Sequence, residues 1–149
     1  MIDVVKIFSD AATVAGYEFA YGRKDILNYE SGVVTLSSGK HVLMVLPFIE
    51  TARISNGIIN DWNVSTQLWL GKKFDTSVST GTYADLDETE KQKYDRRLKT
   101  MRSTLNSLIG TIFCGEDLEL TSCRIYREIN QFDENIDFIT ADITFLYDS

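Results

Sequence analysis

An alternation of apolar and polar side chains decides the fold, and it is clearest in residues 136–147, IDFITADITFLY. Successive side chains of a β-strand point to opposite faces, so a period of two residues predicts a strand with one buried face. A similar alternation in residues 118–130 predicts the preceding strand, and the polar residues 133–135 turn the chain between them. The apolar face of the closing strand is expected to hold Ile139, Ala141, Ile143, Phe145 and Tyr147.

Two segments instead follow the 3.6-residue period of an amphipathic helix. The first covers residues 3–15 and ends at Gly16. The second covers residues 87–113, where Asp87 is the expected N-cap and Glu90 completes a capping box. Its apolar stripe is expected to pack on the sheet and consists of Tyr94, Leu98, Met101, Leu105, Leu108, Ile109 and Ile112.

Three strands are expected between these helices. Tyr17, Phe19 and Tyr21 alternate with smaller or polar residues, and residues 29–36 either continue this strand or form a short one of their own. Residues 41–54 predict one long strand in which Pro47, lacking a backbone donor, marks a bulge or a break in pairing. The third strand runs from about residue 59 to residue 73, and the polar, aperiodic residues 74–86 predict a mobile loop.

The element order is therefore helix, three strands, helix, two strands, in a single α+β domain spanning residues 1–149. We expect a mainly antiparallel or mixed sheet of four or five strands with the second helix laid across one face. The 44% apolar and 25% charged residues are typical of a globular domain. No apolar run approaches the roughly 20 residues that span a bilayer, and the N-terminus lacks a secretory pattern, so folding in a cytoplasm is expected.

The net charge of -7 is concentrated at the C-terminal end of the chain. Residues 1–109 hold 13 acidic and 13 basic side chains, whereas residues 110–149 hold nine acidic ones against Arg124 and Arg127. An acidic sheet is a poor surface for gripping phosphates, because nucleic-acid affinity rests on Lys and Arg. A solvated face is the default interpretation, and the border of a channel through which nucleic acid slides is the alternative hypothesis.

The residue types needed for catalysis or metal binding are not assembled in the sequence. A single histidine cannot build a multi-histidine metal site, and no phosphate-binding glycine motif occurs. His41 is expected to be a solvent-facing strand residue, and nothing supplies an orienting third group for a His41–Cys114 pair. Cys114 and Cys123 are expected to be small packing residues, with a disulfide as the alternative. The sequence therefore predicts no catalytic, cofactor or metal site, and a protein that is not an enzyme.

The second helix carries a basic face opposite its apolar stripe, and acidic residues interrupt it. Aromatic stacking partners are few, so a solvated or intersubunit face is favoured over a nucleic-acid surface. The basic face consists of Lys91, Lys93, Arg96, Arg97, Lys99 and Arg102.

The element order, the length and the closing run of residues 136–145 together resemble the tail terminator (tail-completion) proteins and related neck proteins of long-tailed bacteriophages. The resemblance covers the full chain. It implies a virion component, made and assembled in the host cytoplasm, that forms a homo-oligomeric ring, usually a hexamer. Such a ring caps the tail tube and offers the head a docking surface, so the implied partners are tail-tube and neck or connector proteins. DNA passes nearby without specific binding, and no membrane, cofactor or catalytic residue is implied.

Charge segregation suggests how such a ring would close. We expect the basic face of one subunit, especially Arg96, Lys99 and Arg102, to lie near the acidic last two strands of the next. Loop 74–86 is expected to become ordered at a contact with another ring through Phe74, Val78 and Tyr83. Two other classes stay open: an enzyme, which needs a pocket joining His41 or Cys114 to carboxylates, and a monomeric binding or adaptor module, which needs an exposed apolar patch.

Overall fold

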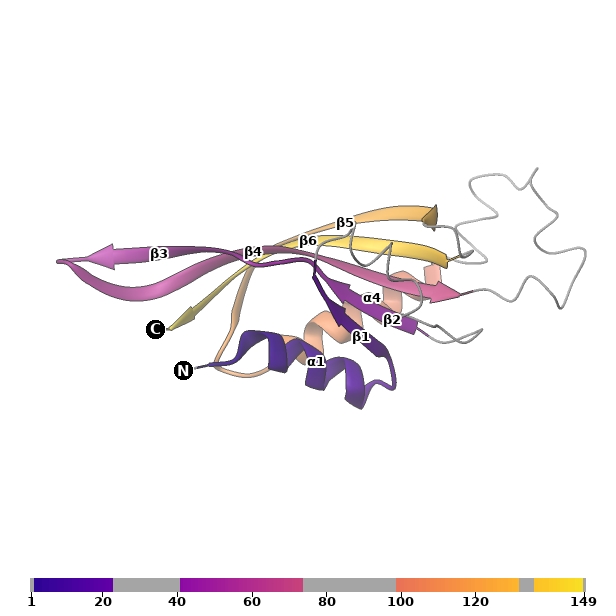
Figure 1. Cartoon of the computed structure of the whole chain (residues 1–149), viewed down its shortest axis with the longest axis horizontal. Coiled ribbons are helices and arrows are strands. Elements are labelled where there is room, and N and C mark those ends of the chain that lie inside the picture. Colours follow the sequence, from indigo (N-terminus) through magenta and orange to yellow (C-terminus); the bar gives the residue numbers. More distant parts are fainter. Residues whose placement is uncertain (1, 23–40, 74–98, 132–135, 149) are drawn as a thin grey trace, which may run out of the picture.

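The computed structural model describes residues 2–22, 41–73, 99–131 and 136–148 (Figure 1). Within these ranges the chain forms two helices and six strands, an α+β arrangement as predicted. The elements are α1 (Val4–Val14), β1 (Glu18–Tyr21), β2 (His41–Val45), β3 (Ile49–Ser55), β4 (Ile58–Lys73), α4 (Lys99–Ile112), β5 (Glu119–Gln131) and β6 (Ile136–Asp148). The predictions for residues 29–36, for the loop at residues 74–86 and for the helix start at residues 87–98 lie outside the described ranges.

All six strands join one sheet in the order β1-β2-β4-β6-β5, and β3 also pairs with β4. Only the β1–β2 pair is parallel within the described residues, so the prediction of a mainly antiparallel, mixed sheet is confirmed. The long β4 and β6 strands form its centre, with Asp61 opposite Asp148 at one end and Lys73 opposite Ile136 at the other. The expected strand count is wrong by one, because residues 41–54 form two strands.

Pro47 causes this division. Val45 on β2 is opposite Leu68 of β4, and Ile49 on β3 is opposite Ser65, so three residues face two across the ladder. Proline cannot donate a ladder hydrogen bond, and a bulge accommodates it. The backbone N–H of Leu46 still donates to the carbonyl of Gln67 at 3.0 Å. The predicted bulge at Pro47 is thus present, and β2 and β3 continue one another along the same edge of β4.

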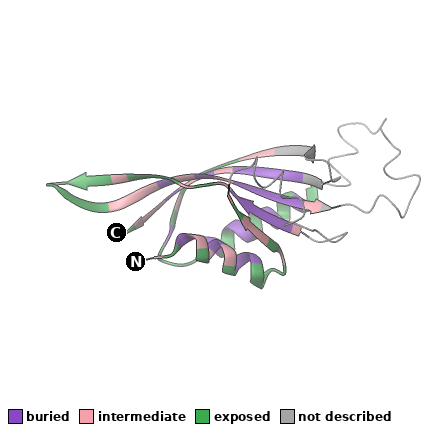
Figure 2. Cartoon of the chain, in the orientation of Figure 1, coloured by how far each residue is buried: buried purple, intermediate pink, exposed green. Residues whose placement is uncertain are grey.

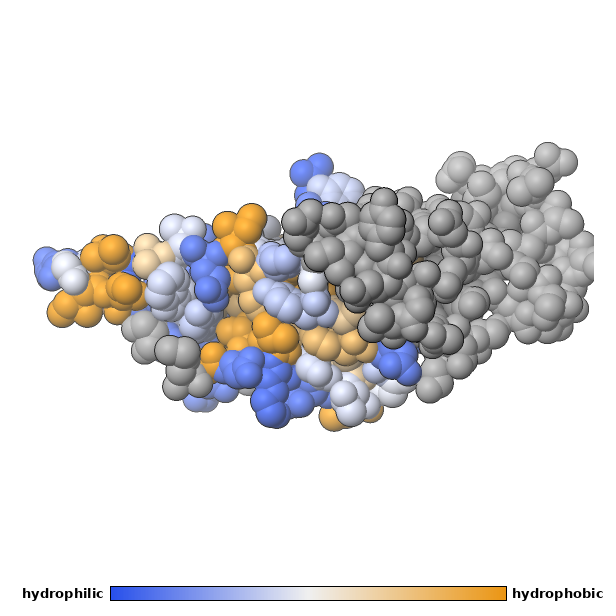
Figure 3. Space-filling view, in the orientation of Figure 1, coloured by the Kyte–Doolittle hydropathy of each residue, from blue (hydrophilic) through white to orange (hydrophobic). Residues whose placement is uncertain are grey.

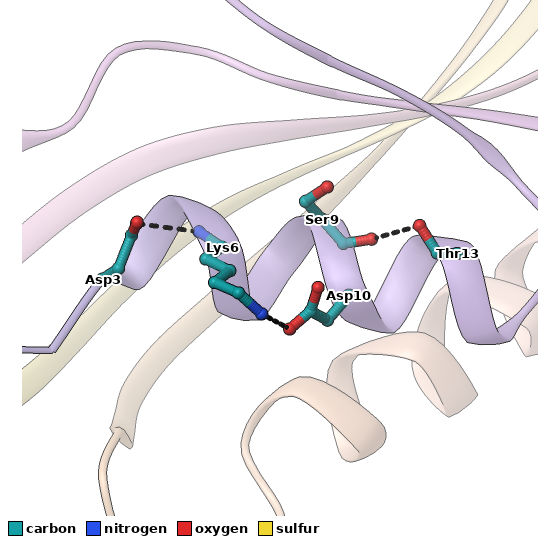
Figure 4. Close-up of polar contacts among 5 residues, drawn as sticks. All are labelled: Asp3, Lys6, Ser9, Asp10 and Thr13. Carbon is teal, nitrogen blue, oxygen red and sulfur yellow. Dashed lines mark hydrogen bonds and ion pairs between the residues drawn. The ribbon is translucent and has the colours of Figure 1, made fainter.

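Local capping explains where α1 begins and ends (Figure 4). The Asp3 carboxylate accepts a hydrogen bond from the backbone N–H of Lys6 at 3.0 Å, which satisfies one donor of the first turn. One turn later the Lys6 ammonium pairs with Asp10, and this hydrogen bond raises the pKa of Lys6 above its ordinary value. Gly16 adopts a positive φ of 79° at the C-terminal end, a conformation that glycine tolerates best.

Both helices cover the same face of the sheet (Figures 1 and 2). Phe8 of α1 lies among aromatic side chains from three other segments, including Phe145 of β6 at a centroid distance of 5.9 Å. The α4 stripe is buried as predicted at Met101, Leu105, Leu108, Ile109 and Ile112, while Tyr94 and Leu98 lie outside the described residues. On β6 the predicted face is buried at Ile139, Ala141, Ile143 and Phe145, and Tyr147 is half-buried.

A second, smaller apolar cluster lies on the sheet face away from the helices. Val42, Met44, Trp69 and Phe138 are its buried members. Residues 42–45 are therefore buried on both faces, which confirms the expectation of a strand that is apolar on both sides at its start. None of the described helices has the length and apolar character needed to cross a membrane.

Candidate assembly surfaces

Of the residues predicted to lie at an interface, the structure describes only the two at the start of α4. Lys99 and Arg102 are both exposed. Within the described ranges, neither takes part in an ion pair. Arg96, Phe74, Val78 and Tyr83 lie outside the described residues, so the structure gives them no place relative to this basic helix start.

The two residues considered for nucleophilic chemistry are not brought together by any contact among the described residues. His41 is half-buried at the start of β2, with its ring centroid 4.9 Å from that of Tyr17, so the expected solvent-facing position is wrong. Burial, and then the charge of Lys72 opposite it, lowers the pKa of His41 below 6.5. Cys114 follows α4, and its thiol donates to the carbonyl of Thr111 at 3.0 Å.

Both cysteines are exposed free thiols, so the expectation that they pack in the core is wrong. Cys114 lies beyond the last turn of α4, and Cys123 lies on β5, an edge strand of the sheet. The alternative, a disulfide between them, is not formed in this structure. In the part of the chain that the structure describes, no three His, Cys, Asp or Glu side chains are grouped so that they could hold a metal ion.

A polar network crosses the sheet face that lies away from the helices. The Gln67 amide donates to the Asp142 carboxylate at 2.7 Å, and the Trp69 indole N–H donates to the Gln67 carbonyl at 2.7 Å. A hydrogen bond with Asp142 raises the pKa of Tyr126, and the Arg124 guanidinium lies 5.1 Å from the centre of that tyrosine ring. Asp142 is therefore engaged within its own subunit, although sequence reasoning counted it toward an acidic surface for a neighbour.

The sequence predicted a hairpin connection at Gly57, and the structure has it, but sequence reasoning missed that this hairpin, residues 49–61, projects from the body; we call it the arm. It extends past both helices at one end of the molecule (Figure 1). Asn56 and Gly57 form its turn with φ values of 54° and 75°, the backbone twist that suits a two-residue hairpin loop. The arm exposes large apolar side chains: Ile49 (71% exposed), Ile54 (66%), Ile58 (66%) and Ile59 (40%). Its end is orange in Figure 3.

Polar contacts hold the base of the arm against the body. The Tyr147 hydroxyl donates to the Glu50 carboxylate at 3.0 Å, and Arg53 pairs with Asp61 across the hairpin at 3.3 Å. Partial burial and this hydrogen bond raise the pKa of Tyr147. The tip beyond them, residues 54–60 (ISNGIIN), contains no charged residue. In the sequence, the Asn56-Gly57 pair between isoleucines indicates this hairpin, because Asn-Gly is typical of a two-residue hairpin turn.

A groove of about 350 Å³ lies between α1 and α4. Ala11, Val14 and Ala15 line it from the first helix, and Ser103, Ser107 and Leu108 line it from the second. None of its lining residues is charged, although 25% of the chain is. Val14 is 83% exposed beside it. The small side chains on both helices leave this space open, and we call it the α1–α4 groove.

Four exposed acidic side chains and two exposed basic ones lie toward opposite ends of the molecule. The chain leaves α4 and enters β5 at the arm end, where Glu119 is opposite Leu146 and Asp148 is opposite Asp61 (Figure 1). Exposed Glu116, Asp117, Glu119 and Asp148 therefore gather near the base of the arm, and we call them the acidic end. Lys99 and Arg102 lie at the opposite end, because α4 begins there and runs back toward the arm.

The chain matches no model of a known protein family, and no curated protein matches it. We therefore infer the function of this chain from its arm, its α1–α4 groove and its charged ends.

Proposed function

We propose that this chain is a non-enzymatic structural component of a bacteriophage virion, a tail-completion or head–tail neck protein that works as a homo-oligomeric ring. One observation carries the proposal. The arm and the acidic end lie at one end of the subunit, while the α1–α4 groove lies between the two helices, on a different part of the surface. A contact that joins two different surfaces of neighbouring copies is heterologous, and such contacts generate a ring when the rotation between subunits closes.

The architecture also suits a ring component. The central strands β4 and β6 are continuously paired from Asp61 to Lys73, which gives the body a stiff core. The arm extends this sheet beyond its own hydrophobic core, so Ile49, Ile54 and Ile58 remain 66–71% exposed in the subunit that carries them. Exposed apolar side chains concentrated on a projection mark a contact with another protein more often than an isolated exposed residue does.

The solution mass of the purified chain tests this proposal. We expect light scattering and native mass spectrometry to give one fixed multiple of 16.9 kDa at micromolar concentration, and electron microscopy to give closed rings. Incubation with the tail-tube protein encoded beside it is expected to place these rings at tube ends. A chain that stays monomeric at all concentrations, with and without tube protein, would contradict the proposal. Portal, tail-tube and tape-measure genes alongside its own gene would support it.

The arm also favours a second candidate, a binding or adaptor module that uses its isoleucines on an unrelated partner. Such a module would remain a monomer and would not associate with tail-tube protein. The same mass measurements therefore separate the two proposals.

A further inference from the structure

We infer that the tip of the arm of one subunit seats in the α1–α4 groove of the next copy of this chain. This inference rests on the proposed ring, and it names the contact that closes that ring. The occupant of the groove is thus a second copy, and the residues that enter it are Ile54 and Ile58 of the neighbour's hairpin.

The chemistry of the two surfaces matches. The tip, residues 54–60, has no charged residue, and the groove lining has none either. Burying a charge without a partner costs far more than burying apolar groups, so an uncharged tip and an uncharged groove combine with the least desolvation penalty. The exposed Ile54 and Ile58 side chains supply apolar surface, and Ala11, Ala15 and Ser107 supply the space for it.

The arrangement of the elements makes the contact intermolecular. The arm projects away from α1 and α4 at one end of the sheet, and the stiff β3–β4 ladder carries it there (Figure 1). The groove is lined by Val14 and Ala15, at the end of α1 that lies farther from the arm. A surface and a complementary pocket at different places on one molecule produce a heterologous contact between copies.

The basic start of α4 favours a copy of the same chain, which carries the acidic end beside its arm, while the exposed Glu18 follows the groove residue Tyr17. An arm entering the groove brings the acidic end of its own subunit toward the neighbour, whose α4 starts with Lys99 and Arg102. Opposite charges around an uncharged contact set its register and raise the rate of encounter. The groove and the charges around it therefore complement features that this chain itself carries.

Disulfide trapping tests the contact directly. In a background of Cys114→Ser and Cys123→Ser, which replaces two exposed thiols, one chain carries Ile58→Cys and another carries Ser107→Cys. We expect copper-phenanthroline oxidation to link the two chains when they are mixed and assembled, with the linked peptides identified by mass spectrometry. Each chain alone serves as the control. A ring that forms but gives no mixed link overturns the inference, and a dominant Ile58–Ile58 link assigns the arm to another arm instead.

Matched substitutions give an independent readout. Ile58→Asn at the tip and Ser107→Trp in the groove are expected to weaken ring assembly at least tenfold in concentration. The controls are Ser122→Asn on the exposed part of β5, outside the arm, and Asn106→Trp on the exposed face of α4 outside the groove. Circular dichroism and the melting temperature of each monomer establish that it is folded.

The possible outcomes separate this contact from the proposed function. Rings that assemble equally well in both test variants overturn the contact and leave the ring in place. A wild-type chain that never forms a ring overturns both. Assembly lost in the test variants and kept in the controls supports the arm as the element that closes the ring.

Discussion

The Phe138 ring on β6 lies over Gly71, its cross-strand partner on β4, so closely that a Cβ atom on residue 71 would lie 2.4 Å from the ring atom Cε1. Phe138 is fully buried, and its ring packs edge-on against Trp69 at a centroid distance of 5.5 Å. An aromatic side chain thus covers the strand glycine.

The first prediction concerns this contact. Gly71→Ala is expected to lower the free energy of unfolding by about 1–3 kcal/mol, the usual cost of overpacking a core. Gly110→Ala is the matched control, because a Cβ atom at Gly110, exposed on α4, meets nothing within 4 Å. The control is expected to be stabilising by up to about 1 kcal/mol, since alanine favours helix over glycine. Urea denaturation measures the free energy of unfolding of both variants. Equal values for Gly71→Ala and Gly110→Ala would show that β4 and the Phe138 ring accommodate the added methyl group without loss of stability.

The second prediction concerns the packing of α4 on the sheet. Leu105 is fully buried in the main core, so Leu105→Ala is expected to lower the free energy of unfolding by about 2–5 kcal/mol. The neighbouring Asn106 is exposed, and Asn106→Ala is expected to change stability by less than about 0.5 kcal/mol. If chemical denaturation ranks the two variants alike, the placement of this helix face against the sheet is wrong.

The third prediction is a pH dependence that originates at His41. Its pKa is lowered in the folded protein, first by burial and then by Lys72, so the unfolded chain binds the proton more tightly. Stability is therefore expected to fall as the pH drops through 6.5 toward the folded-state pKa, and to be fully present above 6.5. Thermal melts from about pH 7.5 down to about pH 5 cover this window.

His41→Gln provides the comparison for that measurement. It removes the titrating group while keeping a polar side chain beside Tyr17. We expect its stability curve to be flatter than that of the wild type between those pH values. Parallel curves for the two proteins would assign the pH dependence to other groups.

Local patterns were sufficient to predict several elements, and the reasons are visible in particular residues. The two-residue period placed Ile139, Ala141 and Ile143 on the buried face of β6, and the missing donor of Pro47 marked the bulge. The parallel pairing of β1 with β2 could not be predicted in this way. Periodicity reports which face of a strand is buried, and it carries no information about the strand beside it.

The candidate surfaces were harder to predict than the elements. Ile54 and Ile58 have the same apolar character as core residues, and only the end of the hydrophobic core beneath the arm leaves them exposed. The Gln67–Asp142 hydrogen bond joins residues that are 75 positions apart, so it requires the β4–β6 register. The α1–α4 groove likewise depends on how two helices pack, which neither helix encodes alone.

The last prediction concerns the charges at the two ends of the subunit. Lys99→Glu with Arg102→Glu is expected to slow ring assembly in low salt while leaving the monomer folded, because both side chains are exposed. Exposed ion pairs contribute only about 0–1 kcal/mol each, so they affect register and rate more than the stability of a finished ring.

Raising the ionic strength toward 0.15 M, where charges separated by more than about 8 Å are largely screened, is expected to slow wild-type assembly without dissolving existing rings. Adding Glu116→Lys, Asp117→Lys, Glu119→Lys and Asp148→Lys to the same chain exchanges the signs of charge at both ends and is expected to restore the rate, as measured by stopped-flow light scattering. A charge-reversed chain that assembles at the wild-type rate in low salt would remove the two charged ends from the interface, while the arm and groove would still stand on their own test.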